Sequence, residues 1–261
     1  MRCIHIDFIV RNLLLILLAF LALSSRAQQT LRVCYDNWPP YAAYDNKSGH
    51  SGITIDLIRE IYGAMGLALN FQSGTQTRCL QAAHEGKIDA MLFADKETLP
   101  TWKFTTTPTE YWLVAAWVQE GSMLKRFDGL DQFAQARVGI VKNYVYPQQV
   151  GQYQNWETVE MTDPMDGLRQ LSAKRIDVMF DDLIWVERVR KEQQLIIRLL
   201  EPIVEVMPQF HAVRPELAAK VAEFDREVQR RIKSGEMEKR YRSAIGLSFD
   251  AIRRNDLKNV R

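Results

Sequence analysis

Acidic residues follow two similar segments of this chain, where they could transfer protons or hold a ligand. Gly-Lys-Ile-Asp-Ala-Met-Leu-Phe at 86–93 is followed by Asp95, and Lys-Arg-Ile-Asp-Val-Met-Phe at 174–180 is followed by Asp181 and Asp182. A carboxyl group in a crevice can serve as a general acid or base, and a carboxylate accepts hydrogen bonds. These two segments therefore mark where chemistry is expected.

Each segment has the pattern of a helix that leads into a buried strand. The amphipathic run before the first contains Leu80 and Ala83, and the run before the second contains Leu168 and Leu171. A continuous apolar strand after a helix is typical of a parallel sheet covered on both faces. Two such units predict two α/β lobes. Ligands in open α/β sheets bind beyond the carboxyl ends of the strands, so the acids should lie on both walls of a crevice.

The rest of the chain supplies further elements of both lobes. Strands are expected at 31–35, 68–72, 110–118, 138–141, 156–160 and 203–213. Helices are expected at 53–65, 78–86, from Asp163 onward, and at 182–192, 217–232 and 237–241. No low-complexity linker is present, so strands near 117–120 and 209–214 should join the lobes. The expected division is a signal peptide at 1–27, lobe 1 at 28–118 and 211–247, lobe 2 at 119–210, and a frayed polar tail at 248–261.

The first residues have the features of an export signal. Arg2 and Arg11 flank the apolar run at 13–23, which is too short to span about 30 Å of hydrocarbon as a helix. Small residues around Ser25-Arg26-Ala27 predict cleavage after Ala27. The alternative is an uncleaved anchor. We expect a soluble, monomeric protein in the periplasm.

Charge and composition exclude a nucleic-acid partner. The chain has 34 basic and 32 acidic residues, and loss of 1–27 removes three arginines and one aspartate, which leaves a net charge near zero. Nucleic-acid binding requires a basic stripe, and the sequence has none. Removal of the signal leaves Cys34 and Cys79, whose even number in an oxidising compartment predicts a disulfide. Two buried free thiols are the alternative, and neither a metal site nor a cofactor is expected.

The order of several short motifs resembles a known family. The motifs are Leu31-Arg-Val, Asp-Asn-Trp-Pro-Pro-Tyr at 36–41, Gly52 with Ile55-Asp56-Leu57, Gly86-Lys-Ile-Asp89, Phe104-Thr with Pro108, Val138-Gly-Ile-Val-Lys142, Arg175-Ile-Asp177 with Asp182, and Tyr241 with Gly246. Together they resemble the periplasmic solute-binding proteins of ABC importers, in the cluster of family 3 that binds polar amino acids. The resemblance covers about 31–246. It implies a type II periplasmic-binding-protein fold, with two doubly wound mixed sheets, a two-strand hinge and a ligand between the lobes.

The resemblance also implies roles for individual residues. Trp38 matches the aromatic residue that stacks on an amino acid ligand, and Asp182 matches the acid that takes its amino group. Tyr41 lies in the same first loop and is a further candidate. Trp38 could alternatively pack on the lobe surface, and Asp182 could simply cap the following helix.

Two departures concern the ligand carboxylate. The loop at 94–103 has no arginine, although the family places its carboxylate-binding arginine there. The family's Gly-Thr-Thr turn is replaced by Asn143, Tyr144 and Val145, and Tyr144 should narrow the pocket. A lysine does not reproduce the planar two-pronged contact of arginine. Either the ligand is not an ordinary α-amino acid, or Arg78 or Lys142 supplies the charge.

These observations predict a solute-binding protein that delivers a small polar solute to an inner-membrane ABC permease. One alternative is an enzyme on the same scaffold, similar to cyclohexadienyl dehydratase, with Asp95, Asp181, Asp182 or Lys142 as its acid or base. Another is a sensing module for a membrane receptor. Trp112, Trp117 and Trp185 are expected in core or hinge packing.

Overall fold

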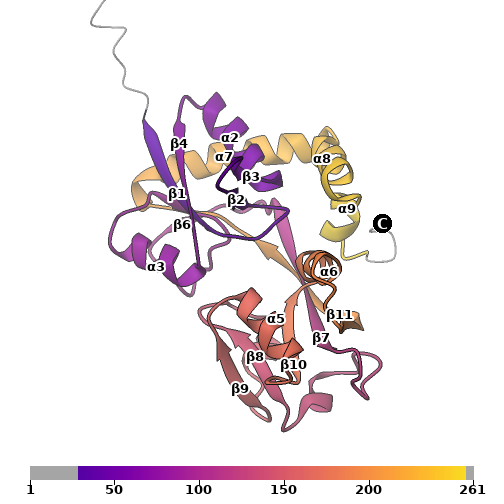
Figure 1. Cartoon of the computed structure of the whole chain (residues 1–261). Helices are drawn as coiled ribbons and strands as arrows, with labels where there is room; N and C mark the ends of the chain where they lie inside the picture. The colour runs from indigo at the N-terminus through magenta and orange to yellow at the C-terminus, as the bar shows by residue number, and fades with distance from the viewer. Residues whose placement is uncertain (1–28, 257–261) are drawn as a thin grey trace, which may run out of the picture.

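The structure, a computed structural model, consists of two α/β halves. It describes residues 29–256, so the signal peptide expected at 1–27 lies outside the described residues. Each half contains a five-stranded sheet, and a separate two-stranded piece pairs β2 (Ala43–Asp45) with β3 (Gly49–Ser51). Figure 1 shows the two halves one above the other. Within 29–256, no helix is long and apolar enough to cross a membrane.

The first sheet is built around β1, which has parallel partners on both sides. Its strand order is β4 (Ala68–Gly74), β1 (Thr30–Asp36), β5 (Ala90–Met91), β12 (Ala212–Val213) and β6 (Lys103–Phe104). The helices of this half are α2 (Ile53–Ala64), α3 (Gln76–His84), η2 (Pro215–Leu217), α7 (Ala218–Lys233), α8 (Glu236–Ile245) and α9 (Phe249–Arg253). β12 runs antiparallel to β5 and β6, so the sheet is mixed.

The second sheet has β7 and β10 near its centre. Its strand order is β11 (Ile197–Gln209), β7 (Glu110–Gln119), β10 (Val178–Asp182), β8 (Arg137–Val141) and β9 (Glu157–Met161). Its helices are η1 (Leu130–Phe133), α4 (Gln148–Gly151), α5 (Pro164–Ser172) and α6 (Leu183–Glu192). β8 is parallel to β9 and β10, whereas β7 is antiparallel to β10 and β11. Two mixed sheets with helices confirm the predicted fold class.

The chain passes between the sheets at two places, and the first differs from the expectation. It lies at 105–109, between β6 and β7, and not near 117–120. The apolar run at 110–118 forms a central strand, and all of its partners belong to the second sheet. The second crossing, at 210–211 between β11 and β12, lies within the expected 209–214. The lobe boundary predicted at 118 and 119 therefore falls inside β7.

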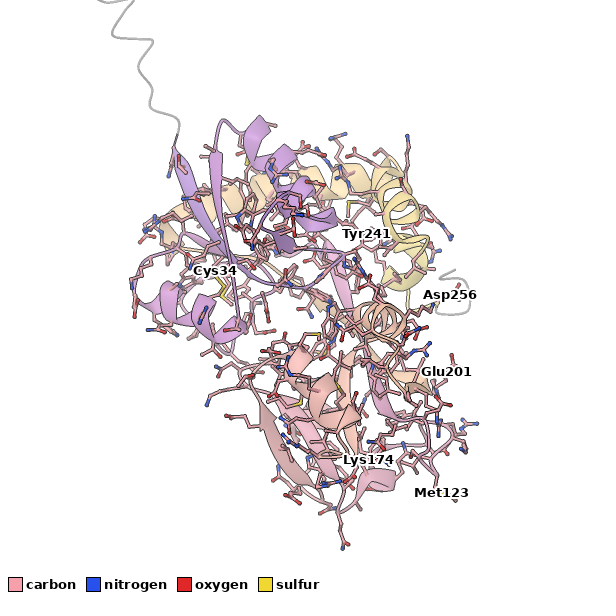
Figure 2. The ribbon with its side chains drawn as sticks, viewed as in Figure 1. Cys34, Met123, Lys174, Glu201, Tyr241 and Asp256 are labelled. Carbon is pink, nitrogen blue, oxygen red and sulfur yellow. A yellow bond between two sulfur atoms is a disulfide. The ribbon has the colours of Figure 1, made fainter. Side chains whose placement is uncertain are left out.

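Two local features hold the first half together. Cys34 in β1 and Cys79 in α3 form the predicted disulfide, drawn in yellow beside the Cys34 label in Figure 2. The expected frayed tail is wrong for its first part, because α9 packs on the core. Phe249 and Ile252 are buried there, and Phe249 contacts the ring of Tyr241 at 4.9 Å between centroids. This burial removes apolar surface from water, which explains the ordered turn after Gly246.

Candidate ligand-binding site

A crevice between the two halves collects side chains from both. It encloses about 570 Å³ of empty space, including the part that is open to solvent. Its lining contains three acids, five aromatic side chains, three amides and two other residues: Asp36, Asp95, Asp181, Trp38, Phe93, Trp112, Tyr144, Trp185, Asn37, Gln76, Gln209, Val145 and Pro164. Among the described residues, no lysine, arginine or histidine belongs to this lining.

The three acids come from strand ends of both sheets. Asp36 is the last residue of β1, Asp181 lies near the end of β10, and Asp95 follows β5 in the next loop. The carboxyl ends of strands meet at the crevice in open α/β sheets, which explains how residues so distant in sequence come together. Within residues 29–256, no group of three His, Cys, Asp or Glu is placed to hold a metal ion. The acids therefore surround the crevice and do not converge on one point.

Asp181 is the acid of the described lining that has a buried carboxyl oxygen without a hydrogen-bond partner. Its side chain is 3% exposed, and Oδ1 accepts a hydrogen bond from the backbone N–H of Asp182 at 2.7 Å. Oδ2 is buried without a hydrogen-bond partner. Burial raises the pKa of Asp181 to about 8, and the nearby charges of Asp182 and Asp36 act in the same direction. A buried, unpaired acceptor oxygen is costly unless a ligand donates to it.

The other two acids also have raised pKa values. Burial raises the pKa of Asp36 to about 6, although the hydroxyl of Tyr144 donates a hydrogen bond to its Oδ2 at 2.7 Å. Burial raises the pKa of Asp95 to about 7, and the charge of Glu97 contributes to this rise. All three acids therefore lie in surroundings that penalise an uncompensated negative charge.

Aromatic side chains form much of the wall. The ring of Trp38 meets Phe93 edge to face, with centroids 5.0 Å apart, and lies 4.4 Å from the ring of Tyr41 beneath it. Trp112 meets Tyr144 edge to face at 5.8 Å. Such contacts hold the large rings in fixed orientations along the wall of the crevice.

Hydrogen bonds also cross the crevice directly. Besides the bond from Tyr144 to Asp36, Asn143 Nδ2 donates to Oγ1 of Thr77 at 2.9 Å. Asp36 and Thr77 belong to the half with β1, whereas Asn143 and Tyr144 follow β8 in the other half. The structure therefore shows the two halves in contact, as in a closed arrangement.

Three of the residues predicted for the site line the crevice: Trp38, Asp95 and Tyr144. Asp182 lies behind the wall. It caps α6, because its Oδ1 accepts the N–H of Trp185 at 2.7 Å and its Oδ2 accepts the N–H of Leu113 at 3.2 Å. Burial raises its pKa to about 6, and these hydrogen bonds oppose the rise. The neighbouring Asp181, on the other face of the strand, is the acid that reaches the crevice.

The remaining predicted residues lie elsewhere. Tyr41 is fully buried in the core beneath Trp38. Arg78 is exposed on α3, and Lys142 is exposed and forms a salt bridge with Glu160 at 3.0 Å. Neither cation belongs to the lining. Asn143 is not part of the lining either, but its side chain donates a hydrogen bond to Thr77 in the opposite half.

Several lining residues were not predicted as ligand contacts. Trp112 and Trp185 were expected in packing, and Asp36, Gln76 and Gln209 were not singled out. Asp36 ends the first strand, so the rule that marked Asp95 and Asp181 also applies to it. Gln76 and Gln209 lie at the boundaries of α3 and β11, where sequence alone does not show which way a side chain points.

The sequence matches one family over most of its length. The model of bacterial extracellular solute-binding proteins, family 3, matches residues 31–246. The chain belongs to this family. As a family 3 solute-binding protein it is one of a class that binds small molecules outside the cytoplasm and works with ABC permeases. No curated protein sequence matches the chain.

Solved structures share the fold at low sequence identity. An ancestral arginine-binding protein bound to arginine is 19% identical, with a TM-score of 0.70 over 82% of this chain and 97% of that chain. A histidine kinase sensor domain with similarity to periplasmic binding proteins is 21% identical, with a TM-score of 0.72 over 85% and 98%. A putative L-cystine ABC transporter from Listeria monocytogenes is 16% identical, with a TM-score of 0.68 over 84% and 96%. At these identities, the three structures show that the family 3 solute-binding protein shares their fold.

Proposed function

We propose that this chain captures a small polar solute in the crevice and delivers it to an inner-membrane ABC permease. The observation that carries the proposal is the crevice itself, lined from both halves by acids and aromatic rings and bridged by the bond between Tyr144 and Asp36. Binding stabilises the arrangement in which both walls touch the solute. We infer a binding protein and not an enzyme, because the family is one of solute-binding proteins and an arginine-binding protein shares the fold.

For this role we expect the protein to act in the periplasm as a soluble monomer after removal of 1–27. Thermal-shift screening of the purified protein against small polar metabolites tests capture. A ligand should raise the melting temperature, and X-ray scattering should show a more compact particle when that ligand is added. A protein that responds to no member of a broad panel and shows no compaction would contradict capture.

A sensing role is the second candidate. It is favoured by the likeness to a histidine kinase sensor domain, which covers 98% of that chain. The discriminating measurement is reconstitution with any ABC permease and ATPase that neighbouring genes encode. Solute uptake into vesicles that depends on this protein supports transport. Binding without uptake, together with co-purification of a membrane receptor, supports sensing.

A further inference from the structure

We propose that the solute is an organic cation that carries N–H groups and lacks a carboxylate. The inference rests on the proposed solute-binding function and deepens it by naming the class of ligand. Amines and guanidines of the size of a decarboxylated amino acid belong to this class.

The charge of the crevice is the first argument. Its described lining holds Asp36, Asp95 and Asp181 and no basic side chain. The two cations that the sequence suggested for a ligand carboxylate are unsuited, because Arg78 is exposed on the surface of α3 and Lys142 is paired with Glu160. A ligand carboxylate would enter a desolvated, acidic site without a counter-charge, which is strongly unfavourable.

The unpaired oxygen of Asp181 is the second, independent argument. Asp181 lines the crevice and is only 3% exposed. Its Oδ2 receives no hydrogen bond. The ionised carboxylate only accepts hydrogen bonds, so a ligand that binds this form must supply a donor to Oδ2. An ammonium or guanidinium N–H satisfies both the hydrogen bond and the charge, and makes a shorter, stronger bond than a neutral donor.

The aromatic wall is the third argument. Trp38, Trp112, Trp185 and Tyr144 line the same space as the acids. The faces of such rings attract a cation, most strongly for tryptophan and more strongly when water is excluded. Cations with N–H groups use both features of the crevice, whereas a quaternary ammonium ion would leave Oδ2 of Asp181 without a donor.

The protonation of the acids is consistent with this class of ligand. Burial raises the pKa of Asp181 to about 8 and that of Asp95 to about 7, so the empty crevice holds protons near neutral pH. A bound cation favours the ionised carboxylates and replaces those protons. The acids can thus stay neutral without ligand and become charged when the cation arrives.

Matched pairs of ligands test the inference. Agmatine and arginine share the guanidinium group and the chain and differ by the carboxylate, and putrescine and ornithine form a second pair. The protein is freed of co-purified ligand by unfolding and refolding, and binding is measured by isothermal titration calorimetry. We expect at least one of the decarboxylated members to bind at least tenfold more tightly than its amino acid. Equal or tighter binding of the amino acid in both pairs would overturn the inference.

A substitution at Asp181 ties the preference to the crevice. Asp181→Asn keeps Oδ1 as an acceptor for the N–H of Asp182 and removes the charge, so the fold should be retained. We expect affinity for the bound amine to fall at least tenfold. The control is Asp128→Asn, because Asp128 is an exposed acid paired with Arg126 outside the crevice. Circular dichroism verifies folding of both variants, and an unchanged affinity in Asp181→Asn would overturn the inference.

The outcomes separate this inference from the proposed function. Binding of a neutral or anionic solute in place of every amine, abolished by changes in the crevice, would refute the cation class and leave solute capture standing. Failure of the amines, the amino acids and a broad panel of polar solutes alike would refute both.

Discussion

At the scale of single residues, adjacent acids have different roles because strand side chains alternate between faces. Asp181 and Asp182 follow one another at the end of β10. Asp182 turns toward the start of α6 and is satisfied by two backbone N–H groups, whereas Asp181 turns to the crevice and keeps an unpaired oxygen. The period of two in a strand guarantees that the two carboxyl groups cannot share one face.

The buried charge of Asp181 should cost stability at neutral and higher pH. Its folded pKa of about 8 lies above its ordinary value of 3.8, so the folded state binds a proton that the unfolded state releases in this window. Stability from this group is therefore present at low pH and is lost as pH rises from about 4 to about 8. Asp181→Asn should be more stable by about 2–4 kcal/mol at about pH 8, with little difference near pH 4.

Urea unfolding at both pH values, without ligand, measures this effect. Asp128→Asn is the control, because Asp128 is 62% exposed at its side chain and should change stability little at either pH. The same pH dependence in Asp181→Asn as in the unmodified protein would contradict the assignment.

The affinity of the crevice for a cation should increase with pH, because Asp181 must lose its proton on binding. Binding requires ionised Asp181 and Asp95, whose pKa values of about 8 and about 7 leave them protonated in the empty crevice at lower pH. Affinity should rise from about pH 6 to about pH 8, by up to about tenfold per pH unit for each proton released. The other titratable groups whose charge acts on or is felt from Asp181 are Asp182, Asp36, Tyr144 and Tyr146.

Calorimetry in buffers of different ionisation enthalpy counts the protons released on binding. The number should be smaller in Asp181→Asn than in the unmodified protein. An affinity that falls with rising pH would instead indicate a ligand that accepts a hydrogen bond from the protonated acid.

At the scale of elements, the two repeated segments perform the same structural task. Asp89 accepts hydrogen bonds from the backbone N–H and the guanidinium of Arg32 in β1, and Asp177 does the same for Arg137 in β8. Each aspartate thus fastens the loop after a helix to the start of a neighbouring parallel strand. The repeat therefore marks equivalent positions in both sheets, and the carboxyl ends of the following strands face the crevice.

The disulfide fastens another pair of elements, β1 and α3, beside the crevice. Cys34 and Cys79 are separated by 45 residues, for which the chain-entropy account predicts a contribution of about 4 kcal/mol. The double variant Cys34→Ser with Cys79→Ser should lose about that much stability, measured by denaturant unfolding. Dithiothreitol should destabilise the unmodified protein to the same degree and leave the double variant unchanged. Equal sensitivity of both proteins to the reductant would contradict this account.

At the scale of the whole molecule, closure depends on contacts between the two halves. Tyr144→Phe removes the hydroxyl that binds Asp36 across the crevice. A hydrogen bond to a carboxylate contributes about 1.5–3 kcal/mol. The ratio of closed to open molecules should therefore fall by at least about tenfold. X-ray scattering without ligand should show a larger radius of gyration, and ligand dissociation should be faster.

A matched control exists within one half. Tyr153 donates a hydrogen bond to Asp131 Oδ1 at 2.9 Å, and both residues belong to the half with the second sheet. Tyr153→Phe removes the same kind of bond without affecting the contact between halves. An equal change in scattering from both variants would contradict a role for Tyr144 in closure.

Much of the fold could be predicted, because its signals are local. The apolar run at 110–118, the cap at Asp163 and the cysteine pair each identify an element or a bond from neighbouring residues. The first crossing between the sheets could not be placed, because an apolar strand is equally compatible with either sheet until its hydrogen-bonded partners are known. The packed helix α9 was missed because three buried apolar residues lie within a polar stretch.

The sequence by itself determined the two α/β units, the acids at their strand ends and the absence of the family's arginine from 94–103. Only the tertiary structure decided which acid reaches the crevice. Asp182 and Asp181 are indistinguishable as neighbours in a sequence, but the strand directs them to opposite sides. The tertiary structure also decided that Arg78 and Lys142 lie outside the crevice, because the position of a long side chain depends on the packing of distant elements. The crevice is therefore acidic as a consequence of folding, and this acidity is the basis for expecting a cation.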